Sequence, residues 1–316
     1  MNSLRRKTIV LRPILGMSPG FALAVVVCIV AVGVFAAVML DDISRGAKKS
    51  PSVVSATNAN FEQPAATIVR SHTADSSVAW LRHSAPFPTD DPAPRMAIVV
   101  VDDGSDATAA LSAMRLSAPL TLAIAPTADA AARRAEAARR YGREVLLLLP
   151  MQAEEKFDDT PNPIAIHVPH SELNRRMNWN LAQIDGYVGV MNSFGEATTR
   201  DAGTMRAVLE VVKSKGLSFI DSRAHKDSVA SAVARRMGVP TGDRVVAIDA
   251  GSSVQDFEVG LNTGLRHAER WGTSIVTIPA DRKLIAALQD WIAEAPSEVR
   301  LAPVTAVIKR LRSSKT

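Results

Sequence analysis

The chain has 316 residues, of which 47% are hydrophobic and only 4% aromatic, so it can fill a large core but offers few rings for stacking on single-stranded nucleic acid. Its formal net charge of +5 is concentrated in the first 50 residues, where seven Lys and Arg stand against two Asp, and the neutral remainder argues against a nucleic-acid partner. The single cysteine excludes a disulfide within the chain and a cysteine-based zinc site.

The N-terminal part has the pattern of a membrane anchor. Residues 21–40 carry no charged side chain over a length that spans a bilayer. Basic residues precede this run and acidic residues follow it, namely Arg5, Arg6, Lys7 and Arg12 before it, and Asp41 and Asp42 after it. The positive-inside rule then predicts a cytoplasmic segment 1–20, a single transmembrane helix 21–40 in the inner (cytoplasmic) membrane, and an extracytoplasmic, periplasmic remainder. A cleaved signal peptide is the alternative, but the run is long for one and lacks a clear small-x-small cleavage site.

A linker is predicted over residues 41–94, where Ser, Thr, Ala and Asp dominate without sustained apolar periodicity. Its one apolar cluster, residues 78–81, allows two interpretations. The cluster either docks on the domain that follows or is an apolar patch within a disordered segment.

From residue 97 onward, apolar strand-like runs alternate with helix-like segments that end at glycines. The predicted strands are 97–101, 120–124, 144–149, 187–191, 217–220, 244–248, 274–278 and 299–301. The predicted helices are 107–114, 128–141, 172–184, 201–215, 228–237, 254–271, 282–293 and 304–311. Regular alternation predicts an α/β fold with a parallel sheet, and about eight units predict a TIM-like (β/α) barrel, somewhat distorted, over residues 95–316.

Candidate site residues follow the predicted strands, because barrel sites lie at the carboxyl ends of the strands. The polar residues there include Asp102, Asp103, Asn192, Asp221, Ser222, Arg223 and Asp249. Two carboxylates held close together need a cation, so a metal or an arginine is expected beside them. We therefore predict that Asp102, Asp103, Asp221 and Arg223 line one polar pocket.

Each of these residues also has a structural interpretation. Adjacent residues of a strand point to opposite sides, so only one of Asp102 and Asp103 need face the pocket, and Asp103 could cap the following turn. Asp221 and Arg223 could form a structural ion pair. The remaining candidates are more typical of turn caps or exposed positions; they are Asp249, His167, His170, His225 and His267.

Several motifs together resemble the divergent polysaccharide deacetylase family. They are Val101-Asp102-Asp103-Gly104, Val145–Met151, Gly189–Asn192, Met205–Glu210, Phe219–Arg223 and Met237–Pro240, and they cover nearly all of residues 97–312. The resemblance implies a distorted β/α barrel acting on an N-acetylated glycan. It also implies that Asp102 is a general base and that Asp103 and histidines hold a divalent metal, usually zinc. From their places at the strand ends, Asn192, Asp221, Ser222 and Arg223 are expected in the binding site.

The chain departs from the family pattern where metal ligands are expected. Leu148, Ser193 and Ile278 stand at positions where the family often has histidine, and Gln152 stands where an acid is common. The segment 193–196 reads Ser-Phe-Gly-Glu in place of the usual His-Met-Gly-Ser. Because zinc prefers imidazole or thiolate ligands, these changes predict low metal affinity and weakened or lost deacetylase activity.

Three functions compete. The first is a non-catalytic relative that binds an envelope glycan or an envelope protein, and the second is an active metal-dependent glycan de-N-acetylase with Asp102 as base. A signalling receiver domain is the third, but it needs a phospho-accepting aspartate after the third strand, where this chain has Leu149 and Pro150.

Overall fold

A computed structural model describes residues 78–88, 90–154, 160–242 and 245–313. The predicted membrane-spanning run and most of the predicted linker lie outside these residues. Among the helices that the structure describes, none combines the length and apolar character needed to cross a membrane.

Parallel strands form one sheet in the order β6-β5-β4-β3-β2-β1-β8-β7, with β9 paired to the start of β1. The strands are β1 (Arg95–Asp102), β2 (Thr121–Ile124), β3 (Glu144–Met151), β4 (Gly189–Phe194), β5 (Ser218–Ile220), β6 (Thr241–Gly242), β7 (Val245–Ala247), β8 (Thr273–Pro279) and β9 (Arg300–Leu301). The helices are α2 (Ala79–Arg82), α3 (Ala107–Arg115), α4 (Ala131–Arg140), α5 (His170–Leu181), the short 3-10 helix Thr198–Arg200, α6 (Ala202–Ser214), α7 (Ala230–Arg236), α8 (Val254–Trp271), α9 (Arg282–Glu294) and α10 (Val304–Ser313).

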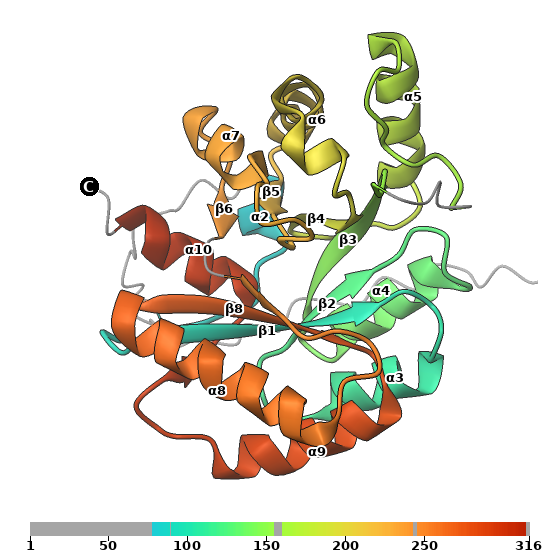
Figure 1. The fold of residues 1–316 in the computed structure, drawn as a ribbon. Coiled ribbons are helices and arrows are strands. Elements are labelled where there is room, and N and C mark those ends of the chain that lie inside the picture. Colours follow the sequence, from blue (N-terminus) through green and yellow to red (C-terminus); the bar gives the residue numbers. More distant parts are fainter. Residues whose placement is uncertain (1–77, 89, 155–159, 243–244, 314–316) are drawn as a thin grey trace, which may run out of the picture. The chain divides into compact units, whose positions relative to one another are not determined.

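The sheet is a nearly closed TIM-like barrel, which confirms the predicted fold class. Figure 1 shows α3, α8 and α9 on one side of the sheet and α5, α6 and α7 on the opposite side, over β3 to β6. The end strands β6 and β7 follow one another in the sequence without an intervening helix. Two details differ from the prediction. The strand β6 was not predicted, because two residues are too few to give a sequence pattern. The predicted last strand, 299–301, pairs beside β1 instead of completing the barrel.

Residues of β1 alternate between two apolar clusters, as expected for a strand with both faces covered. Met96, Ile98 and Val100 pack in the large cluster that includes the outer helices. Ala97 and Val99 pack in the inner cluster, together with residues of α10. The barrel interior is therefore partly filled by the last helix rather than by strand residues alone.

The segment before β1 is folded onto the barrel, which differs from the linker predicted up to residue 94. Trp80 of α2 is buried in the inner cluster, and its backbone N–H donates to the Gly216 carbonyl at 2.9 Å. The buried Arg95 side chain donates to the carbonyls of Pro88 and Asp91 at 3.4 and 3.2 Å. Of the two interpretations of residues 78–81, docking is the one observed, because a tryptophan supplies enough apolar surface to order a short helix.

Candidate functional site

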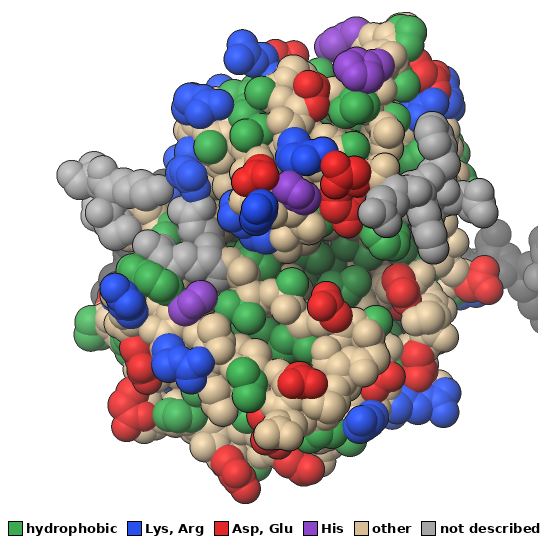
Figure 2. Space-filling view, viewed as in Figure 1, with side chains coloured by type: hydrophobic (Ala, Val, Ile, Leu, Met, Phe, Trp, Pro, Cys, Tyr) green, Lys and Arg blue, Asp and Glu red, His purple; other side chains and the backbone are tan. Residues whose placement is uncertain are grey.

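The carboxyl ends of the strands bring together most of the polar residues singled out in the sequence. We call this end of the barrel the carboxyl-end face. Figure 2 shows acidic, basic and histidine side chains intermixed on the displayed face, around a hollow in which hydrophobic side chains are visible. Comparison with Figure 1 places this hollow near the carboxyl ends of β2 and β3. Barrel sites usually lie at this end of the strands.

Asp102, the last residue of β1, has no exposed surface. It shares the strand face of Ile98 and Val100, which points to the outer helices, and its Oδ2 lies 3.0 Å from Nε of Arg134 on α4. The contact is ionic, since neither atom has a well-aligned hydrogen bond within the described residues. The other oxygen, Oδ1, accepts the Gly104 N–H at 3.2 Å.

Burial is the main influence on the pKa of Asp102 and raises it above the usual value, because the charged form loses its hydration. The Arg134 charge and the Gly104 N–H act in the opposite direction, and the neighbouring Asp103 charge adds to the rise. Asp102 is thus a buried carboxylate that takes up a proton more readily than an ordinary aspartate, and Arg134 is its counter-ion.

Asp103 is exposed, and its Oδ1 accepts the Ser105 N–H at 2.9 Å. This is the turn cap considered as its structural alternative. The turn also requires Gly104, whose φ is +100°, and a Cβ at that position would lie 3.0 Å from the Ala128 Cβ. Asp102 and Asp103 therefore point in different directions, as strand geometry predicts.

Asn192 and Ser222 lie in contact across the ends of β4 and β5. The Asn192 amide oxygen accepts the Ser222 N–H at 2.8 Å, and its Nδ2 donates to Ser222 Oγ at 2.7 Å and to the Phe194 carbonyl at 2.6 Å. Asn192 is buried and uses both ends of its amide in these bonds. It fixes the loops after β4 and β5 to one another, while the Ser222 hydroxyl retains a hydrogen to donate.

Asp221 is fully buried and holds the loop between β5 and α7 in place. It accepts the Arg223 N–H at 2.9 Å, the Ser228 hydroxyl at 2.7 Å, and longer bonds of 3.4 Å from the Ser231 backbone and hydroxyl. Arg223 has a φ of +62°, and its exposed side chain donates to the Lys226 carbonyl at 3.2 Å. No side-chain ion pair joins Asp221 to Arg223 among the described residues.

These contacts therefore do not form the predicted pocket of Asp102, Asp103, Asp221 and Arg223. The arginine beside a buried carboxylate is Arg134, which the sequence reasoning missed, and Arg223 points elsewhere. A signal for Arg134 was present in the sequence. It falls on the same helical stripe as Ala131, Ala135 and Ala138, so an arginine interrupts an otherwise apolar buried face.

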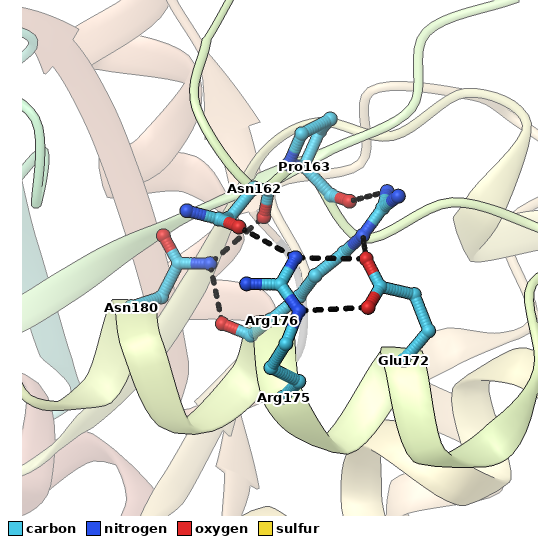
Figure 3. Close-up of polar contacts among 6 residues, drawn as sticks. All are labelled: Asn162, Pro163, Glu172, Arg175, Arg176 and Asn180. Atoms are coloured by element: carbon cyan, nitrogen blue, oxygen red, sulfur yellow. Dashed lines mark hydrogen bonds and ion pairs between the residues drawn. The ribbon is translucent and has the colours of Figure 1, made fainter.

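The loop after β3 is held to α5 by a cluster of polar contacts (Figure 3). Glu172 accepts bonds of 2.7 Å from both Arg175 and Arg176, and these bonds lower its pKa to about 2. Three hydrogen bonds join the helix to the loop. Arg175 donates to the Asn162 side chain, Arg176 donates to the Pro163 carbonyl, and Asn180 donates to the Asn162 carbonyl. The cluster positions the returning strand segment at Ile164, which bridges to Met151 at the end of β3.

The hydrogen bonds of His170 and His225 are local. His167 and His170 are exposed, and His170 Nδ1 lies 3.1 Å from Asn174 Nδ2. His225 Nδ1 accepts the Asp227 N–H at 3.1 Å within its own loop. These contacts match the structural alternatives considered from the sequence.

Comparison with known proteins identifies the family. The model of the divergent polysaccharide deacetylase family matches residues 98–308. The chain belongs to this family. The resemblance inferred from the Asp102-Asp103 motif and the motifs after it is thereby confirmed.

Two relatives illustrate the match. An uncharacterized protein of Haemophilus influenzae is 26% identical over 207 residues, which cover 66% of this chain and 74% of that protein. The crystal structure of ATU2773, an uncharacterized protein from Agrobacterium tumefaciens C58, superposes with a TM-score of 0.68 at 26% identity. That superposition covers 72% of this chain and 94% of the other.

Deacetylases related to this family usually depend on a metal, which needs a set of side-chain ligands. In the described part of the chain, no group of three or more His, Cys, Asp or Glu side chains could hold a metal ion. Two positions where the family often has histidine are apolar and buried, Leu148 in the inner cluster and Ile278 in the outer one. The described residues do not fit a zinc site of three protein ligands.

Proposed function

We propose that this divergent polysaccharide deacetylase relative binds an envelope glycan at its carboxyl-end face, with deacetylase activity weakened or lost. One observation carries the proposal. The residue in the place of the general base, Asp102, is fully buried and lies 3.0 Å from the guanidinium of Arg134. A general base must come within hydrogen-bonding distance of the proton it removes, and this carboxylate faces the helix layer instead.

The family also has an active-enzyme interpretation, in which Asp102 is the base of a metal-dependent glycan de-N-acetylase. The raised pKa of Asp102 favours it, since enzymes often raise the pKa of a catalytic carboxyl group by burial. This interpretation requires the first turn of α4 to move, so that Arg134 releases the carboxylate toward the carboxyl-end face.

We further propose that the N-terminal run 21–40 anchors the chain in the inner membrane and places the barrel in the extracytoplasmic space, where it meets an envelope glycan or an envelope protein. Support comes from the charge asymmetry around the run. Alkaline phosphatase fused after residue 316 should be active, because the enzyme works only after export. A stably expressed but inactive fusion would show that the barrel stays in the cytoplasm.

The function is tested with the purified full chain in mild detergent. We expect it to co-sediment with purified peptidoglycan and to release no acetate from it above a protein-free control, with or without added Zn²⁺. The reason is that binding needs only the exposed face, whereas hydrolysis needs a base that water can reach. Asp290→Asn, a change at an exposed position on α9 and away from the strand ends, serves as the control and should behave as the unmodified chain does.

A further inference from the structure

The carboxyl-end face carries an exposed aromatic side chain whose placement is not explained by folding. Five large hydrophobic residues are exposed in the described part of the chain, and 53% of the Phe194 surface is accessible. The other four lie on the outer helices or at their ends, namely Leu111, Tyr141, Val259 and Trp271. Phe194 alone follows a barrel strand, at the end of β4.

The backbone of Phe194 is strained and is held in that state by its neighbours. Its φ of +53° is unfavourable for a bulky residue, and Gly195 continues the turn with a φ of +99°. The Asn192 side chain binds the Phe194 carbonyl at 2.6 Å, and Thr199 binds the Gly195 carbonyl through both its N–H and its hydroxyl. Such strain persists only where surrounding bonds enforce it, and here its result is to direct an aromatic ring outward.

Two polar side chains come from the loops around Phe194, one from its own loop and one from the loop after β5. Glu196 is two residues further on, and its buried Oε2 accepts no hydrogen bond within the described residues. The Ser222 hydroxyl, in contact with Asn192, retains a hydrogen to donate. The loop therefore combines an exposed aromatic ring with a nearby hydroxyl donor, whereas the Glu196 oxygen is closed off from solvent.

These groups match the two sides of a pyranose ring. One face of a sugar presents C–H groups, which pack on an aromatic face, while the ring edge presents hydroxyls that need donors and acceptors. We infer that Phe194 is a sugar-stacking platform and that the segment 193–196, together with Ser222, determines how a pyranose unit of the glycan binds. The inference rests on the proposed function, because it assigns a recognition element to the same face.

The inference is tested by measuring the depletion isotherm of the full chain on purified peptidoglycan. Phe194→Ala should weaken the apparent Kd about tenfold, whereas Phe194→Trp should retain or improve it, because a larger ring keeps the stacking surface. Ser222→Ala should weaken binding about threefold by removing the hydroxyl donor. Tyr141→Ala, which removes an exposed aromatic ring at the C-terminal end of α4, is the matched control and should leave the Kd unchanged.

The outcomes separate the two claims. No binding by the unmodified chain would overturn the proposed function and this inference together. Full binding with equal affinity in Phe194→Ala and in the unmodified chain would overturn the inference alone. The melting temperature of each variant is measured in parallel, and if Phe194→Ala is unfolded, the comparison of Phe194→Trp with Phe194→Asp decides, with tight binding expected only for the aromatic substitution.

Discussion

Replacing Arg134 with alanine should lower the free energy of unfolding by about 3–5 kcal/mol at neutral pH, because it leaves the buried Asp102 carboxylate without its counter-ion. Both side chains are almost inaccessible to solvent, so water cannot replace the lost partner. Denaturant unfolding followed by tryptophan fluorescence measures the loss.

The loss should depend on pH in a defined direction. The pKa of Asp102 is already raised in the folded chain, and removing Arg134 raises it further, so the folded variant takes up a proton more readily than the unfolded chain. Its destabilisation should therefore be largest above the folded pKa and shrink as the pH falls toward the unfolded value of about 3.9. Arg140→Ala is the control on the same helix, since its pair with Glu136 is largely exposed and should cost less than about 1 kcal/mol. A loss as small as this in Arg134→Ala would contradict the ion-pair role.

Replacing Glu144 with alanine should cost about 3–5 kcal/mol, because it removes the acceptor of several buried donors, each worth about 1–3 kcal/mol when left unpaired. Glu144 begins β3 and is fully buried. It accepts the Ala85 N–H at 2.9 Å and the Thr305 N–H at 3.0 Å, as well as the Thr305 hydroxyl. One carboxylate thus joins the segment after α2, the sheet and the first turn of α10.

The pH dependence gives a second test of Glu144. Burial raises its pKa above the usual value, so the folded state binds more protons than the unfolded state between the two pKa values. The stability that Glu144 contributes is therefore greatest at low pH and falls as the pH rises through this window. The difference in unfolding free energy between the unmodified chain and Glu144→Ala should narrow over the same range. A difference that widened with pH would rule out a raised pKa.

The barrel could be predicted from the sequence because each long strand carries its own pattern. The valine run before Asp102 and the leucine run before Pro150 are apolar throughout, which is typical of strands covered on both faces. A short strand, in contrast, forms only because a neighbouring strand pairs with it. The strand β6 has two residues and exists because Phe219 and Ile220 offer it an edge, so no sequence window could reveal it.

The candidate site was predicted less well, because the direction in which each side chain points determines which residues meet. The strand ends were identified correctly at Asp102 and Asp221, whereas β4 continues past Asn192 to Phe194; Asn192 and Ser222 do meet. The alternation that places Val100 against the outer helices also sends Asp102 there, and its partner comes from a helix 32 residues later in the chain. Such long-range partners become visible only once the helices are packed.

Acetate release from peptidoglycan, measured on the same samples that show binding, tests the central claim most directly. The buried Asp102 and the poor metal donor set predict that the bound chain releases no acetate. Asp102→Asn should lower the free energy of unfolding, because buried Arg134 loses its counter-ion, but the folded variant should bind as the unmodified chain does and should also release no acetate. Acetate release that requires added Zn²⁺ and disappears in Asp102→Asn would contradict the claim and would establish the chain as an active de-N-acetylase.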